Sequence, residues 1–373
     1  MKIPLSSPDI SEAEIEAVAS VLRSGRLSLG PKLEEFEAAF AEYNGAANAV
    51  AVSSGTAALH LAMRVLGIGE GDEVIVPSFG FIAVANAVRY ERAVPVFAEI
   101  EPRTLNLDPK RIEEWITPGT RAILAVHTFG VPAAMEEILA IAKRHGLFVI
   151  EDACEALGAE LGGRKAGTFG DVGVFGFYPN KQITTGEGGM LLTRSADVAK
   201  RLRSLRNHGR AAAGEKFDFG EVGYNYRLSE MQCALGIEQV KRVEEILRLR
   251  ARVAAGYQER LKSVAGLGLP VQEIRGGRIS WFVYVVRLPE GTTAEQRDAL
   301  IAKLAERGIE AGRYFLPIHL QPAFRDANFL RKPLPVTESA GARTVALPFF
   351  TRMTEGQVAA VCEAVKEALP AMI

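Results

Sequence analysis

The first half of the chain alternates between helical and strand-like hydrophobic patterns. Ser11 is followed three residues later by Glu14, a capping box, and apolar residues then recur at helical spacing as far as Gly25. Pro31 begins a second predicted helix, which ends at Asn44. Short apolar runs predict strands after that, and further helices are predicted between them at about 56–66, 80–89 and 133–145. The predicted strands are Ala49–Val52, Val74–Val76, Val94–Phe97, Ala122–Val126 and Leu147–Ile150.

Strands that alternate with helices of this length predict an α/β fold with a mostly parallel sheet covered on both faces. The pattern changes after about residue 229, where long helical stretches and few strands predict a smaller α+β region. We expect loops at Gly276–Gly277 and over 317–335. The elements predicted in this region are helical material at 229–262, a strand at Trp281–Arg287, a helix at 293–307, a strand near Ile309–Arg313 and a helix at 354–369.

Charge and composition exclude several classes of partner. The chain has 373 residues, and its 44 Lys and Arg against 45 Asp and Glu give a net charge of -1, so neither nucleic-acid binding nor a polybasic membrane surface is indicated. Hydrophobic residues make up 48% and charged residues 24%, as is typical of a soluble globular protein. The uncharged run from Tyr43 to Met63 contains too many polar residues for a membrane span.

The three cysteines and five histidines show neither a disulfide framework nor metal spacing, and we therefore expect no metal site. The first residues lack an apolar signal core. A cytoplasmic location fits these features best, and they leave a cytosolic enzyme and a soluble binding protein as alternatives. The widely separated cysteines are Cys154, Cys233 and Cys362.

Two candidate segments follow predicted strands, where ligands bind in an open parallel sheet. Ser53–Thr56 is a turn of small residues before a helix, and its free N–H groups suit a phosphate, although an ordinary N-cap turn is the alternative. Glu151 and Asp152 follow the strand Leu147–Ile150. Such acids bind metals, act as bases or pair with a cationic ring, or else are solvated loop or cap residues.

Lys181 is the third candidate. It follows an apolar stretch and precedes the glycine-rich turn 186–189, so it could be desolvated enough to act as a Schiff-base nucleophile instead of a surface charge. A phosphate cradle, an acid and such a lysine are together the parts that hold pyridoxal 5'-phosphate (PLP). The lysine binds the aldehyde, the acid keeps the pyridine nitrogen protonated, and the helix N-terminus neutralises the phosphate.

From about Ile3 to Leu369 the sequence resembles the DegT/DnrJ/StrS family of PLP-dependent sugar aminotransferases. The resemblance implies the aspartate-aminotransferase-like fold type I. It also implies a large PLP-binding domain over 1–240, with an N-terminal arm that packs on a small α+β domain over 241–373. The segments that carry the resemblance include SSGTAALHLA (53–62), FVIEDACEALGA (148–159), GTFGDVGVFGFYPNKQITTGEGG (167–189) and GYNYRLSEMQCALG (223–236).

The resemblance also implies roles for individual residues. Lys181 would bind the cofactor as a Schiff base and then carry the proton between the substrate carbon and the cofactor. Asp152 would pair with the pyridinium nitrogen, and the backbone N–H groups of Gly55 and Thr56 would bind the phosphate. Phe81 would stack on the cofactor ring.

Other implied roles concern the edges of the site. Asn225 would reach the phosphate of the neighbouring subunit's cofactor, which implies a homodimer with shared sites. Glu155 would lie beside the cofactor's phenolic oxygen, where the family often has Gln or His, or else would be a satisfied helix carboxylate. Three residues would border the substrate or merely pack in loops: His208, Tyr314 and His319.

Two positions depart from the family pattern. Gly176 stands where many members have a phosphate-binding serine, and Gly80 stands where many have threonine. A phosphate hydrogen bond would therefore come from backbone groups or water.

The expected reaction is amino transfer from an amino acid, by resemblance glutamate, to a keto sugar on a nucleotide, at carbon 3 or 4. One alternative is a PLP enzyme acting on a cyclitol or other carbocycle. The other is a non-catalytic PLP-binding regulator, and the Lys181–Asp152 pair argues against it.

Overall fold

The computed structural model describes residues 2–210, 218–325 and 329–369. Its centre is a seven-stranded sheet with the order β1-β9-β8-β5-β4-β2-β3. The neighbours from β8 to β3 pair in parallel, whereas β9 is antiparallel to both β1 and β8. The predicted mostly parallel sheet is therefore confirmed. Its strands are β1 (Asn48–Val52), β2 (Glu73–Pro77), β3 (Val94–Ala98), β4 (Thr120–Val126), β5 (Phe148–Asp152), β8 (Val172–Gly176) and β9 (Gly189–Thr193).

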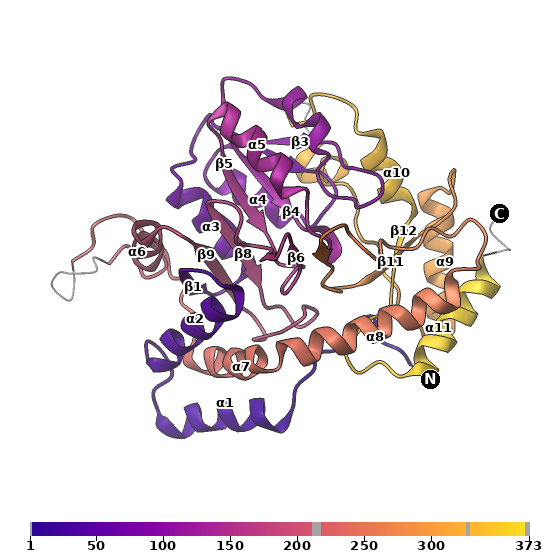
Figure 1. Cartoon of the computed structure of the whole chain (residues 1–373), viewed down its shortest axis with the longest axis horizontal. Helices are drawn as coiled ribbons and strands as arrows, with labels where there is room; N and C mark the ends of the chain where they lie inside the picture. The colour runs from indigo at the N-terminus through magenta and orange to yellow at the C-terminus, as the bar shows by residue number, and fades with distance from the viewer. Residues whose placement is uncertain (1, 211–217, 326–328, 370–373) are drawn as a thin grey trace.

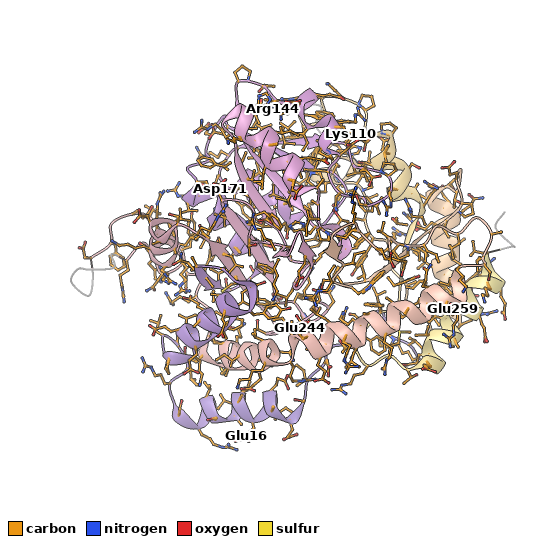
Figure 2. All side chains as sticks on the ribbon, viewed as in Figure 1. Glu16, Lys110, Arg144, Asp171, Glu244 and Glu259 are labelled. Atoms are coloured by element: carbon orange, nitrogen blue, oxygen red, sulfur yellow. The ribbon has the colours of Figure 1, made fainter. Side chains whose placement is uncertain are left out.

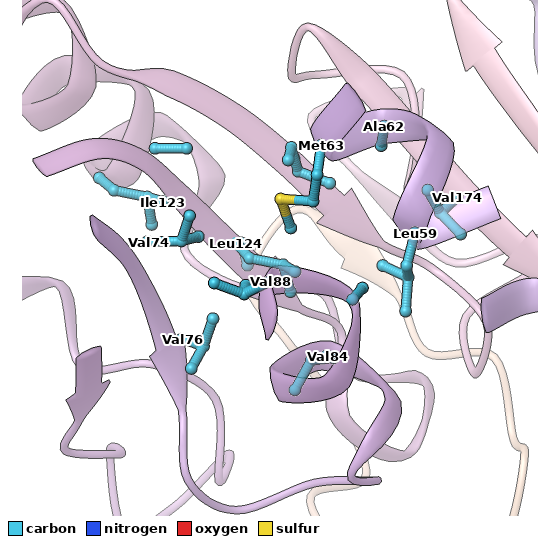
Figure 3. Packing of buried hydrophobic residues seen from close by; sticks show 14 of the residues in the cluster. Leu59, Ala62, Met63, Val74, Val76, Val84, Val88, Ile123, Leu124 and Val174 are labelled. Atoms are coloured by element: carbon cyan, nitrogen blue, oxygen red, sulfur yellow. The ribbon is translucent and has the colours of Figure 1, made fainter. Parts of the chain in front are cut away.

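Helices cover both faces of this sheet (Figure 1). The alternation of β1 shows the two faces, because Val50 and Val52 belong to one buried cluster while Ala49 and Ala51 belong to another. Figure 3 shows α3 and α4 packing on β2 and β4 within the first of these clusters. The helices around the sheet are α2 (Pro31–Asn44), α3 (Gly55–Val65), α4 (Ala83–Tyr90), α5 (Met135–His145), α6 (Ala196–Leu205) and α7 (Glu230–Lys241).

A second, two-stranded antiparallel sheet lies in the C-terminal part, with its own buried cluster. The start of the chain packs there, since Ile3 is buried in that cluster and its N–H donates to the Gly308 carbonyl at 2.8 Å. The predicted boundary at residue 240 falls in the last turn of α7, and the division into two domains stays a prediction. The elements of this part are β11 (Tyr284–Arg287), β12 (Thr344–Leu347), α8 (Val243–Leu261), α9 (Ala294–Glu306), α10 (Pro335–Arg343) and α11 (Glu355–Ala368).

Two details of the predicted elements were wrong. The segment Ile309–Arg313 forms only single bridges, from Ile309 to Ile3 and from Gly312 to Ala346, because it changes pairing partner between them. Gly277 is not in a loop but begins β10 (Gly277–Arg278), which pairs with β6 (Glu160–Leu161) beside β7 (Arg164–Lys165). The described part of 317–335 contains two short 3₁₀ turns, Ile318–Leu320 and Pro322–Phe324, and residues 326–328 of it lie outside the described residues.

The sequence pattern also missed β8, β9, β12, α6 and α10. Within the described ranges, no helix combines the length and hydropathy that a bilayer span requires.

Helix α1 (Glu12–Ser24) lies along α7 and is held there by the buried carboxylate of Glu14 (Figure 1). Glu14 closes the capping box with Ser11 and accepts hydrogen bonds from Gln239 Nε2 and Arg242 Nη1, each at 2.7 Å. Burial alone would raise the pKa of Glu14, but the hydrogen bonds from Ser11, Gln239 and Arg242 outweigh it and lower the pKa to about 2. The Glu14 side chain therefore occupies this buried position as a negatively charged carboxylate.

Replacing Glu14 by Gln should lower the free energy of unfolding at pH 7 by about 1–3 kcal/mol, because Arg242 loses the buried negative charge of Glu14 and keeps only Asp9 as a buried anionic partner. A carboxylate whose folded pKa lies below its unfolded value, about 4.3, stabilises the fold above that value and loses the effect as the pH falls towards 2. Denaturant titrations of wild type and E14Q should therefore converge between pH 5 and pH 2.

The matched control is Glu16→Gln on the same helix. The Glu16 side chain is 63% exposed and lies on the outer side of α1 (Figure 2). We expect E16Q to change the stability by less than about 0.5 kcal/mol. An equal loss in the two variants, or an E14Q effect that persists at pH 2, would contradict the assignment.

Candidate active site

The three candidate segments meet at one edge of the large sheet. β1, β5 and β8 end there and β9 begins there, with Gly189 opposite both Val52 and Gly176. The turn after β1 leads into α3, Asp152 is the last residue of β5, and the loop 177–188 that carries Lys181 joins β8 to β9. The topology therefore brings together residues that are more than 120 positions apart in the chain.

The start of α3 is built to bind an anion. Ser54 caps the helix, since its Oγ accepts from the Ala57 N–H at 3.0 Å, and its carbonyl accepts from the Ala58 N–H at 3.0 Å. The N–H groups of Gly55 and Thr56 are thereby left for an acceptor outside the helix, at its positive end. This is the arrangement expected for the phosphate cradle.

Glycines allow the strand ends to approach this helix start closely. A Cβ on Gly55 would lie 3.2 Å from both Cys154 Sγ and Gly176 Cα, and a Cβ on Gly189 would lie 2.3 Å from the Ser54 carbonyl oxygen. A Cβ on Gly176 would lie 3.3 Å from Cys154 Sγ, so a serine would be crowded at this departure from the family pattern. Gly80, the other departure, faces open space, with nothing within 4 Å of its added Cβ.

The structure gives the two neighbouring acids on β5 different surroundings, whereas the sequence pattern distinguished them only through the family resemblance. Asp152 Oδ1 accepts from the Cys154 N–H at 3.0 Å, and Oδ2 is left for another donor. Glu151 is fully buried instead, where it accepts from His127 Nε2 at 3.0 Å and from three backbone N–H groups. Asp152 is therefore the acid that a ligand can reach.

His127 is a residue that sequence reasoning missed. Its Nδ1 accepts from the Ala133 N–H at 3.0 Å, so the ring proton is on Nε2 and is donated to Glu151. The histidine thereby fixes the loop after β4 against the end of β5. The sequence pattern assigned it no role, because Glu151 and Ala133 reach it only through the fold.

Lys181 is largely buried, with 16% of its side chain exposed. Its Nζ lies 3.8 Å from Glu155 Oε1 and 4.0 Å from the centre of the Phe282 ring. Glu155 lies in a turn and not in a helix, and its Oε2 accepts from the Phe129 N–H at 2.8 Å. Burial raises the pKa of Glu155, although Lys181 and the Phe129 N–H both act to lower it. Phe282 is a second residue that sequence reasoning missed.

Tyr314 also lies beside this group. Its hydroxyl is 3.5 Å from Asn180 Nδ2, and burial and then the charge of Glu155 raise its pKa. The Tyr314 ring stacks on Phe129. Phe81 lies between β2 and α4 with 63% of its surface exposed, so its ring is free to stack on a ligand.

The remaining candidates lie in different surroundings. His319 is buried, with Nδ1 2.7 Å from Ser78 Oγ, which favours a structural role. His208 is exposed, and its backbone N–H donates to the Tyr224 carbonyl.

Asn225 is exposed next to Tyr226, whose carbonyl accepts from the Ser53 backbone N–H at 2.9 Å, so this segment borders the cradle. Within the described residues, no three His, Cys, Asp or Glu side chains are placed to hold a metal ion.

Comparison with known proteins identifies the kind of enzyme to which this site belongs. The chain is 40% identical over 369 residues to the GDP-perosamine synthase of Caulobacter vibrioides, which covers 99% of this chain and 98% of that protein. The aminotransferase TlmJ of Streptoalloteichus hindustanus matches all of both chains with a TM-score of 0.93 and 34% identity.

A putative sugar aminotransferase of Streptococcus pneumoniae, solved in its PLP form, also matches all of both chains, with a TM-score of 0.94 and 27% identity. The model of the DegT/DnrJ/EryC1/StrS aminotransferase family matches residues 8–366. The protein is a PLP-dependent sugar aminotransferase of fold type I, and the chain belongs to the DegT/DnrJ/EryC1/StrS aminotransferase family.

Proposed function

We propose that this enzyme transfers an amino group from glutamate to a keto sugar carried on a nucleotide, at carbon 3 or 4 of a hexose. The observation that carries the proposal is the 40% identity, along nearly the whole chain, to a GDP-perosamine synthase. The name of that relative specifies a nucleotide-linked sugar, which favours such a substrate over a free sugar or a carbocycle.

The residues at the sheet edge fit PLP. The N–H groups of Gly55 and Thr56 would hold the phosphate, Asp152 Oδ2 would accept a hydrogen bond from the protonated ring nitrogen, and Lys181 Nζ would bind the aldehyde carbon. The exposed ring of Phe81 would stack on the cofactor face. When bound, PLP supplies an electron sink for negative charge at the substrate carbon.

Lys181 is the residue that would move protons. Once its amine is free and neutral, it would take the proton from the substrate carbon, and as an ammonium it would return it, as general base and then acid. Its mostly buried position beside the Phe282 ring limits the water that could compete for that proton. Asp152 would remain an anion, because the ring nitrogen must stay protonated throughout.

We also propose that the enzyme is a homodimer in which Asn225 completes the neighbouring subunit's site. Asn225 is exposed, and it lies in a segment that also exposes apolar surface, since Val222 is 78% and Phe219 is 49% exposed. Exposed apolar side chains next to a polar binding residue support an interface at this place.

Adding glutamate to the PLP-loaded enzyme should abolish the absorbance band of the bound cofactor and release 2-oxoglutarate. Lys181→Ala should lose turnover by about 10⁴-fold, because it removes the proposed proton carrier, whereas Lys143→Ala, on the exposed face of α5, should behave as wild type. Circular dichroism would check that both variants are folded. A stable band and no 2-oxoglutarate would contradict glutamate as donor.

The acceptor is tested in the reverse direction. GDP-perosamine and 2-oxoglutarate should react with the PLP-loaded enzyme, as should some UDP- or dTDP-linked amino sugars, and mass spectrometry of the keto product would locate the reacting carbon. A higher kcat/KM with an amino cyclitol than with every nucleotide-linked sugar would overturn the proposed substrate class.

Gly55→Ala should weaken PLP binding about tenfold, which is about 1.4 kcal/mol. The added methyl meets Cys154 and Gly176 at 3.2 Å, so the N–H groups of the cradle must shift by a few tenths of an ångström. Fluorescence titration of the apo-protein with PLP would measure this. Gly69→Ala is the control, since its Cβ finds nothing within 4 Å, and equal affinities in the two variants would show that the cradle lies elsewhere.

The shared site is tested by complementation. Lys181→Ala and Asn225→Asp chains, each inactive as a homodimer, should regain activity when they are co-expressed with different tags and the hybrid is purified. The hybrid would have one site with both native residues, because Asn225 would come from the partner subunit. A hybrid without activity would place Lys181 and Asn225 of one chain in the same site.

A further inference from the structure

The charge environment of Lys181 is dominated by one carboxylate. Glu155 is the acidic side chain that forms an ion pair with Lys181 among the residues the structure describes, with Oε1 3.8 Å from Nζ. The face of the Phe282 ring, 4.0 Å from Nζ, also favours a positive charge there. The nitrogen of Lys181 therefore lies between two groups that stabilise its protonated form.

The backbone holds Glu155 at this position. Its Oε2 accepts from the Phe129 N–H at 2.8 Å, and its carbonyl accepts from Nε2 of Gln182 at 2.6 Å. Gln182 directly follows Lys181, and the same Nε2 contacts Ser280 Oγ at 2.9 Å. The separation of Glu155 from Lys181 is thus set by a buried framework and does not depend on the free rotation of two surface side chains.

Lys181 is the cation that acts on Glu155 in the part of the chain that the structure describes. The titratable side chains that act on it are Lys181 and Asp152, and those on which it acts include Cys154 and Tyr314. Of these four, only Lys181 carries a positive charge. Both oxygens of Glu155 face donors, which suits a carboxylate, while burial and the charge of Asp152 oppose ionisation.

We propose that Glu155 is the counter-ion of Lys181 Nζ and stabilises the protonated form of that nitrogen before substrate binds, both in the apo-protein and when the nitrogen is bonded to the cofactor. The inference rests on the proposed role of Lys181 as the residue that binds PLP. A protonated nitrogen draws electrons from the carbon bonded to it, so an incoming amino group attacks that carbon faster. Glu155 itself would form and break no covalent bond: the C–N bond to the incoming amine would form as the C–N bond to Lys181 breaks, and Lys181 would leave as a free amine.

The alternative is a neutral Glu155 that donates a hydrogen bond to a cofactor oxygen. Gln has nearly the same size and offers an N–H donor but carries no charge. Glu155→Gln would therefore preserve a donor role and remove a counter-ion role, which makes it the decisive variant.

The experiment is a pH titration, without substrate, of the absorbance of bound PLP between pH 5 and pH 10. In E155Q the alkaline midpoint, at which the long-wavelength band of the protonated nitrogen is lost, should fall by about one pH unit or more, because an opposite charge within about 4 Å has been removed. Glu160→Gln is the control, because Glu160 lies on β6 and pairs with Arg278 instead of Lys181. The alkaline midpoint of PLP bound to E160Q should therefore equal that of wild type. An unchanged midpoint in E155Q overturns the proposal and assigns Glu155 to the neutral donor role.

Two further measurements test the proposal if E155Q binds no PLP or does not fold. If E155Q binds no PLP, competitive acetylation of the apo-protein across the same pH range reports the Lys181 amine directly, and its midpoint should also fall relative to wild type. If E155Q does not fold, Glu155→Asp, which withdraws the charge by one methylene, should show a smaller fall, and no change would overturn the proposal. A wild-type protein without any long-wavelength band would instead refute the role of Lys181.

Discussion

The site depends on the close approach of α3 to the ends of β8 and β9. Gly55, Gly176 and Gly189 lack the side chains that would hold these backbones apart, and Ser54 uses its own hydroxyl for the cap. The first N–H groups of the helix are therefore exposed at the same edge as the strand ends. If this contact were wider, the N–H groups that we propose bind the phosphate would no longer share one edge with Asp152 and Lys181.

The hydrogen-bond donors around each carboxylate then give three neighbouring acids different roles. The adjacent acids Glu151 and Asp152 on β5 point to opposite faces of the sheet. Glu151 accepts hydrogen bonds from His127 and from backbone N–H groups, while one oxygen of Asp152 is left to accept from a ligand. A third acid, Glu155, lies in the turn that follows and faces Lys181. Three carboxylates within five residues thus have three different surroundings, because the direction of each side chain sets its donors.

Much of the fold could be predicted from local patterns. The capping box at Ser11 and the proline at position 31 marked helix starts within a residue of those observed, because caps act through neighbouring backbone groups. The strand predicted at Ile309–Arg313 failed, since its apolar residues bridge to two different partners that are far away in sequence. Pairing of that kind leaves no local signal.

The sequence by itself determined the alternation of helices and strands, the three candidate segments, and, through long ordered motifs, the resemblance to sugar aminotransferases. Such features are local in the chain, so they can be read without coordinates. Only the tertiary structure decided that Glu151 is satisfied by His127 and backbone donors, that His319 is buried beside Ser78, and that Phe282 and Glu155 flank Lys181. Each of these depends on contacts between segments distant in sequence, which packing alone brings together.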